Sequence, residues 1–126
     1  RTEKPHQHVA RQVFLPTGPL AFLPMQSLDT KEEGHWQSIV WTLASDYADE
    51  YQLLDNAAFQ QKVAEASHYM LGDVLEVVSR ASFPLIARQA QHYVQDGLVL
   101  VGDAAHVIHP LAGQGVNLGC LDALYW

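Results

Sequence analysis

The first part of the chain alternates between apolar and polar positions in a way that predicts a small β-sheet. Residues 9–15 and 20–25 are two such runs, and the proline- and glycine-containing segment 16–19 between them predicts a hairpin with a four-residue loop. A charged loop over 27–34 leads to a third run, 36–43. Both faces of this run are partly apolar, with Ile39, Trp41 and Leu43 on one face and Trp36 and Val40 on the other. The pattern predicts a sheet covered on both sides, or a sheet with one side against a pocket.

Two helices are predicted to follow the sheet. The first is short and begins at Ser45 or Asp46, either of which can cap it. The second is capped by Asp55 and ends at Gly72. Its apolar residues recur at the helical period and form one stripe: Phe59, Val63, Ala66 and Met70. We interpret this stripe as core packing, and we interpret residues 1–8 as a loose polar segment.

The second part of the chain predicts short strands and a final helix. Residues 74–78 and 83–94 are strand candidates, and 98–101 is a continuous apolar run typical of a strand buried on both faces. Such a strand is normally covered by another domain. Without that cover its apolar surface is exposed, and we therefore expect the chain to self-associate. A helix is predicted to begin near Gly115 or Val116.

Composition excludes several classes of protein. The chain has 126 residues, of which 48% are hydrophobic and 17% charged, as in a globular domain. Its formal charge of −7 opposes nucleic-acid binding, which needs a basic surface. No apolar run is long enough to cross a bilayer. The chain has a single cysteine, Cys120, which is typical of a reducing compartment, so we expect a cytoplasmic protein. We expect Cys120 itself to be a small core residue. The sequence begins within a polar segment and ends within an apolar pattern, so we expect a piece of a longer protein.

Residues 102–117 carry the clearest chemistry. An apolar strand precedes them, Asp103 follows the end of that strand, and a glycine-rich loop leads into the last helix. Ligands of α/β folds lie beyond the carboxyl ends of strands. Gly113 and Gly115 let backbone N–H groups approach a ligand closely, and a helix start favours negative charge. An acid at this place can accept hydrogen bonds from ligand hydroxyls.

A metal site is an alternative interpretation of this segment. The spacing of Asp103, His106 and His109 permits metal binding. However, Pro110 follows directly, and a metal site leaves the glycine-rich loop without a role. We therefore interpret both histidines as structural, with His109 near the ligand, and assign no catalytic acid or base.

The segment resembles a known family. The run Gly102-Asp103-Ala104-Ala105-His106, continued by His109-Pro110 and Gly113-Gln114-Gly115-Val116-Asn117, is similar to the second flavin-binding motif of FAD-dependent aromatic-ring monooxygenases. The runs at 11–14, 21–24 and 38–41 further resemble the ubiquinone-biosynthesis hydroxylases within that family. The resemblance covers essentially the whole chain.

This resemblance implies a fragment of a flavoprotein hydroxylase fold, of the α+β or α/β class. Residues 1–95 would be part of a mostly antiparallel substrate-domain sheet with helices, and residues 96–126 would be the last strand, loop and helix of the FAD domain. Asp103 would bind the ribityl hydroxyls of FAD. The implied cofactor-binding set also contains Gly102, Pro110, Gly113, Gln114, Gly115, Val116 and Asn117. Of these, Pro110 and the 113–117 backbone would lie beside the isoalloxazine ring, where the helix start favours the anion of reduced flavin.

The resemblance also implies an activity. In the family a flavin C4a-hydroperoxide delivers one atom of O2 to a phenolic ring, with NAD(P)H or another reductant as electron donor. The implied substrate is a prenylated phenol of ubiquinone biosynthesis, and its lipid tail implies peripheral contact with a membrane or a biosynthetic complex. The N-terminal Gly-x-Gly-x-x-Gly fingerprint of the family does not occur in this sequence. We therefore expect the chain alone to be inactive and to bind FAD weakly or not at all.

Two other functions stay open. One is a flavin hydroxylase of a small soluble aromatic acid, which needs a basic clamp for which Arg11, Arg80 and Arg88 are available. The other is a non-catalytic β-sheet module of an assembly, which gives no role to Asp103 or to the glycine-rich loop.

Overall fold

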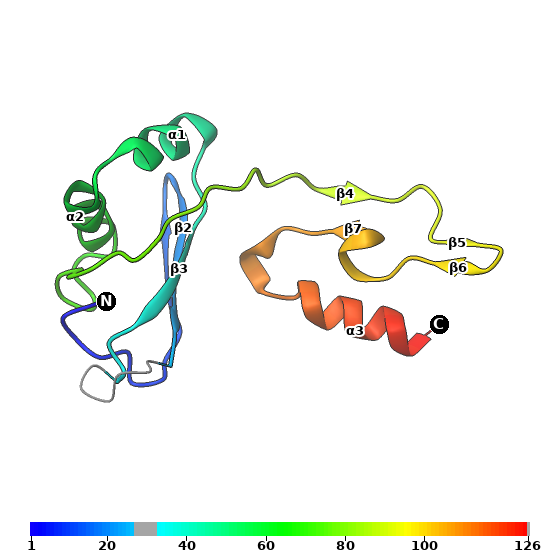
Figure 1. Cartoon of the computed structure of the whole chain (residues 1–126), viewed down its shortest axis with the longest axis horizontal. Helices are drawn as coiled ribbons and strands as arrows, with labels where there is room; N and C mark the ends of the chain where they lie inside the picture. Colours follow the sequence, from blue (N-terminus) through cyan, green and yellow to red (C-terminus); the bar gives the residue numbers. More distant parts are fainter. Residues whose placement is uncertain (27–32, 126) are drawn as a thin grey trace. The chain divides into compact units, whose positions relative to one another are not determined.

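The chain folds as two compact units, Arg1–Ser82 and Phe83–Trp126, in a computed structural model that describes residues 1–26 and 33–125. Three α-helices and short antiparallel sheets make up the described residues (Figure 1). The predicted combination of antiparallel sheet and helices is therefore confirmed. The expected charged loop lies mostly outside the described residues. The assignment of 1–95 and 96–126 to two parental domains stays a prediction, because compactness does not show what each unit binds.

The first unit contains a three-stranded antiparallel sheet in the order β1-β2-β3. Its strands are β1 (Arg11–Leu15), β2 (Gly18–Pro24) and β3 (Gln37–Trp41). The predicted hairpin is confirmed, but its four-residue loop is wrong, because Leu15 already pairs with Gly18 across a two-residue loop. Gly18 has a φ of +128°, and a Cβ there would lie 1.9 Å from the backbone oxygen of Thr42. Only glycine fits this position, so the strand resumes earlier than the turn residues suggested.

The core of the first unit lies between one face of the sheet and α2 (Asn56–Ala66), with α1 (Ser45–Leu53) beside it (Figure 1). Leu20 and Phe22 of β2 and Val63 of α2 are fully buried. The predicted helical stripe packs on this core as expected. The outer face of the sheet is open, and the side chain of Phe14 is 72% exposed. Of the two sheet arrangements predicted, coverage on both sides is therefore wrong for the described residues.

Both helices of this unit form near their predicted places. Asp55 caps α2 as predicted, since its carboxylate accepts the Ala58 N–H at 2.7 Å. The predicted cap of α1 is wrong, because Ala44 stands at the cap position and no side chain bonds to the helix start from there. Helix α2 ends at Ala66, earlier than predicted, and His68 and Tyr69 then take positive φ values in a tight turn. No helix in the described part of the chain is long and apolar enough to cross a membrane.

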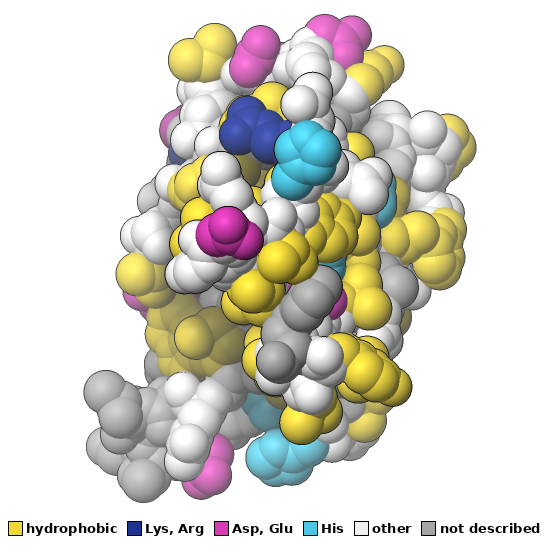
Figure 2. Space-filling model, turned by 90° about the vertical axis from the view of Figure 1, so that its right-hand side faces the viewer, with side chains coloured by type: hydrophobic (Ala, Val, Ile, Leu, Met, Phe, Trp, Pro, Cys, Tyr) yellow, Lys and Arg dark blue, Asp and Glu magenta, His cyan; other side chains and the backbone are white. Residues whose placement is uncertain are grey.

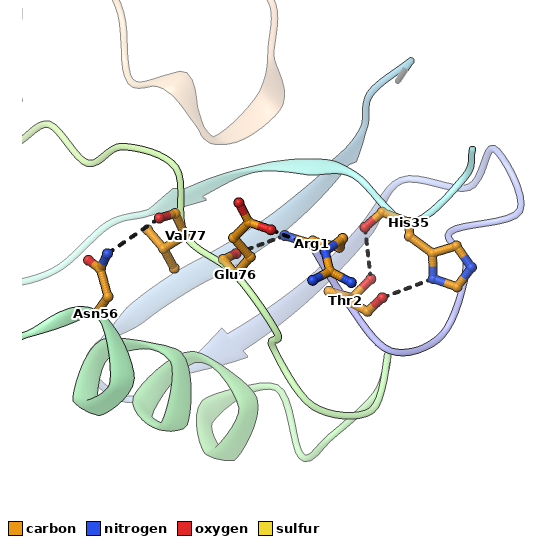
Figure 3. A network of polar contacts seen from close by, with 6 residues as sticks. All are labelled: Arg1, Thr2, His35, Asn56, Glu76 and Val77. Atoms are coloured by element: carbon orange, nitrogen blue, oxygen red, sulfur yellow. Dashed lines mark hydrogen bonds and ion pairs between the residues drawn. The ribbon is translucent and has the colours of Figure 1, made fainter. Parts of the chain in front are cut away.

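The N-terminal segment is ordered by hydrogen bonds, so the prediction that residues 1–8 are loose is wrong. Thr2 and His6 are buried. The Glu3 N–H donates to the Asp73 carbonyl and the Leu75 N–H donates to the Arg1 carbonyl, at 2.9 and 2.8 Å. Figure 3 shows the polar contacts that tie Arg1 and Thr2 to Glu76 and His35. This pairing takes the place of the strand predicted over 74–78, of which only a single bridge between Thr2 and Val74 forms.

The second unit is built from two short antiparallel ladders and one helix. Strand β4 (Arg88–Gln89) pairs with β7 (His106–Val107), and β5 (Val94–Gln95) pairs with β6 (Leu98–Val99). Two 3₁₀ turns, η2 (Gly102–Ala104) and η3 (Pro110–Ala112), precede α3 (Gly115–Tyr125). The helix start is confirmed at Gly115. The long strand predicted over 83–94 is wrong, since only its last part and residues 88–89 pair.

The strand predicted over 98–101 is not buried in this chain. Leu98 and Val99 are 54% and 40% exposed, because β6 pairs with β5 on one edge and none of the described residues forms a packed layer over its faces. Burial on both faces is therefore wrong here, whereas the apolar surface expected of a bare strand is present. Hydrophobic side chains occupy much of the face drawn in Figure 2. Cys120 is exposed as well, which contradicts its predicted place in a core.

Candidate functional site

All the candidate site residues lie in the second unit, on η2, η3 and the start of α3. Asp103 is the middle residue of η2, and η2 packs against α3. Pro110 opens η3, and Gly113 ends it in the left-handed region. Gln114 stands directly before α3, whose first residues are Gly115, Val116 and Asn117. The linear motif therefore becomes two turns and a helix start within one compact unit.

The Asp103 carboxylate is open to a ligand. Its residue is exposed, and within residues 1–26 and 33–125 no hydrogen-bond or charge partner of this side chain is found. An ionised carboxylate is an acceptor with two oxygens, so the group keeps its full capacity for ligand hydroxyls. This is the arrangement expected of a binding acid. A turn-forming aspartate would instead use its side chain on a nearby backbone N–H.

The glycine-rich loop is fixed by its own side chains and leaves space beside its backbone. His109 Nδ1 accepts the Leu111 N–H at 3.1 Å, and Asn117 Nδ2 donates to Gln114 Oε1 at 3.1 Å. A Cβ added at Gly113 or Gly115 would meet no atom within 4 Å. A flat ligand can therefore approach the backbone there, next to a helix start whose N–H groups favour negative charge.

One residue of this region was missed in the sequence, Asp122 on α3. Its Oδ2 accepts the Gly102 N–H at 2.9 Å and lies 2.7 Å from His106 Nε2. The hydrogen bond from the Gly102 backbone, and then the contact with His106, hold the pKa of Asp122 below its ordinary value of 3.8, although burial opposes the shift. No signal in the sequence singled out this residue, because its contacts depend on the close approach of Gly102 to α3 in three dimensions.

The metal interpretation finds no support in this geometry. His106 contacts Asp122, and His109 bonds to its own turn, so neither joins Asp103. Residues 1–26 and 33–125 contain no group of three or more histidine, cysteine or acidic side chains that could hold a metal ion.

The first unit offers a second candidate site, a cavity of about 550 Å³ between the sheet and the helices. Its lining is largely aromatic and aliphatic and includes Phe22, Ile39, Trp41, Phe59 and Val78. Two of its lining residues, Gln37 and Trp41, have a buried polar atom, Oε1 and Nε1, without a partner among the described residues. This confirms the predicted arrangement in which one face of the sheet lies against a pocket.

The comparisons with known proteins decide the family. A family described as FAD binding domain matches residues 3–126. The chain belongs to this FAD-binding family. The resemblance seen in the sequence is thereby confirmed.

Several curated relatives of this family member are similar over most of the chain. The 3-demethoxyubiquinol 3-hydroxylase of Escherichia coli is 46% identical over 111 residues, which cover 88% of this chain and 26% of the relative. The ubiquinone hydroxylase UbiL of Rhodospirillum rubrum is 41% identical, with 95% and 26% covered. The mitochondrial ubiquinone biosynthesis monooxygenase COQ6 of Xenopus tropicalis is 35% identical, with 96% and 32% covered. The chain thus spans about a quarter to a third of the length of these relatives.

The exposed groups of the candidate site suit part of a flavin, the ligand that the family name indicates. Asp103 offers an acceptor suited to ribityl hydroxyls, and the open backbone at Gly113 and Gly115 suits a flat ring whose edge carries negative charge. The roles of the individual residues stay predictions.

Proposed function

We propose that this chain is part of an FAD-dependent monooxygenase that hydroxylates the aromatic ring of a prenylated phenol in ubiquinone biosynthesis. The observation that carries the proposal is the uncommitted Asp103 carboxylate next to an open glycine-rich loop, in a chain of the FAD-binding family. The names of the relatives, a demethoxyubiquinol hydroxylase, a ubiquinone hydroxylase and a ubiquinone biosynthesis monooxygenase, support the substrate class.

In this proposal the chain's own residues bind and orient the cofactor. Asp103 accepts hydrogen bonds from the ribityl hydroxyls, and Gly102 shapes the turn that carries it. Pro110 and the 113–117 backbone would lie beside the ring, where the start of α3 would favour negative charge at the ring edge. When bound, FAD supplies the redox chemistry, with two electrons from NAD(P)H or another reductant, one atom of O2 entering the substrate ring and the other leaving as water.

The cavity of the first unit supports an apolar substrate. Its volume is within the range of small-molecule sites, and its wall is mainly hydrophobic. A lipid-tailed substrate also brings the enzyme to a membrane surface or to a partner in a biosynthetic complex.

A small aromatic acid is the weaker candidate, because two of the three arginines considered for a clamp are engaged. Arg80 donates to the Tyr51 and Leu54 carbonyls and stacks on Phe59, and Arg11 donates to the His6 and Val9 carbonyls. A free guanidinium is what a carboxylate substrate needs. Of these arginines, Arg88 alone is exposed.

The proposal is tested by genetic replacement. The native gene product that contains this chain is expressed in an Escherichia coli strain that lacks its 3-demethoxyubiquinol 3-hydroxylase, and quinones are quantified by chromatography. We expect ubiquinone to return with the wild type and with Asp49→Ala, an exposed acid on α1, and to be reduced with Asp103→Ala. Failure of the wild type to restore any ubiquinone, while it turns over a small aromatic acid in vitro, would favour the alternative substrate.

A further inference from the structure

One carboxylate oxygen on α3 holds both ends of the turn that carries Asp103. Oδ2 of Asp122 accepts the N–H of Gly102, the first residue of η2, at 2.9 Å. The same oxygen lies 2.7 Å from Nε2 of His106, which begins β7 directly after the turn. The ring of Tyr93 contacts His106, with the ring centres 6.1 Å apart. The backbone on each side of Asp103 is therefore anchored to a single side chain.

Close packing of two glycines reinforces this anchor. A Cβ built on Gly119, one helical turn before Asp122, would lie 3.2 Å from the Cα of Gly102. Gly102 itself has a φ of +58°, which side chains other than glycine adopt only at a cost. The turn thus rests directly on the backbone of α3, on the same face from which Asp122 reaches it.

The charge on Asp122 suits this role. The Gly102 N–H is the main cause of the lowered pKa of Asp122, with His106 adding to it, so the carboxylate is ionised at neutral pH. The Asp122 and His106 side chains are 26% and 19% exposed, which leaves them partly screened from water. A carboxylate acceptor makes a stronger hydrogen bond to a backbone N–H than a neutral acceptor does.

Asp103, by contrast, has no partner of its own among the described residues, so the backbone of η2 alone sets where its carboxylate points. We propose that Asp122 is a positioning residue that fixes the Gly102–Ala104 turn against α3 and so holds Asp103 in place for the flavin hydroxyls before the cofactor binds. This inference rests on the proposed function for its ligand, and its first readout needs no ligand.

Two variants separate the contribution of the Asp122 charge from that of its hydrogen-bond acceptor. Asp122→Asn keeps an acceptor of the same shape but loses the charge, and Asp122→Ala loses both. Asp49→Asn is the matched control on an exposed helix position. In the full 126-residue chain without FAD, amide hydrogen exchange at Gly102 is followed by NMR. We expect exchange at Gly102 to accelerate about tenfold in the alanine variant and less in the asparagine variant.

The second readout is the affinity of the native gene product for FAD. We expect it to fall about tenfold in Asp122→Ala, with partial rescue in Asp122→Asn and no change in Asp49→Asn. Unchanged exchange at Gly102 in both Asp122 variants would overturn the inference. So would faster exchange with wild-type FAD affinity, although the proposed function would then survive. A wild-type protein that binds no FAD would instead refute the proposed function itself, and with it the ligand of this inference.

Discussion

Replacing Asp103 by alanine separates a binding role from a structural one. The Asp103 side chain is exposed and has no partner among the described residues, so its removal is expected to change the free energy of unfolding by no more than about 0.5 kcal/mol. A hydrogen bond to a charged acceptor contributes about 1.5–3 kcal/mol. If the ribityl hydroxyls use this carboxylate, the dissociation constant for FAD should rise about 10- to 150-fold.

The assay is a fluorescence titration of the native gene product with FAD, paired with thermal melting of the cofactor-free protein. Asp103→Asn keeps one acceptor oxygen and should lose less affinity than Asp103→Ala, while Asp49→Ala should match the wild type in both measurements. The binding role of Asp103 is refuted if Asp103→Ala binds FAD as tightly as the wild type. It is also refuted if the variant melts well below the wild type, because Asp103 would then support the fold.

Four further predictions follow from single contacts. Gly18→Ala should lower the free energy of unfolding by about 2–4 kcal/mol, since its Cβ meets the Thr42 carbonyl; a urea midpoint equal to that of the wild type would contradict the hairpin geometry. Asp55→Ala should cost about 1 kcal/mol through loss of the α2 cap, measured in the same way, and should leave FAD affinity unchanged. The folded state lowers the pKa of Asp122 below 3.8, so its stabilisation is present above that pH and is lost as pH falls through the folded value. Acid titration of the urea midpoint should therefore be shallower in Asp122→Asn, and equal slopes would argue against the contact. The exposed Leu98 and Val99 should make the isolated chain self-associate in light scattering, and a monomer at all concentrations would count against this.

Local signals in the sequence predicted several elements of the first unit. The alternation in β3, the cap at Asp55 and the stripe through Val63 are short-range patterns, and each appears in the structure. The order of residues 1–6 could not be predicted, because Thr2 is buried by backbone pairing with Val74, more than seventy positions away. Such long-range pairing produces no periodic pattern of apolar residues in a polar segment.

In the second unit, the sequence predicted the strand itself but not its surroundings. An apolar run such as 98–101 predicts that a strand can be buried, but it does not predict which other part of the protein covers that strand. In this chain its faces stay open. The predicted binding motif itself could be recognised in the sequence, since an acid, two glycines and a helix start occur in order. Asp122 escaped notice because its role depends on the three-dimensional approach of Gly102 to Gly119.

In our proposal, Asp103 and the adjoining glycine-rich loop form part of a flavin site. The visible absorption spectrum of the purified native gene product, taken before and after addition of FAD and gel filtration, tests it most directly. We predict a yellow protein that retains about one flavin per chain. A colourless protein that releases all added FAD during filtration would contradict the claim.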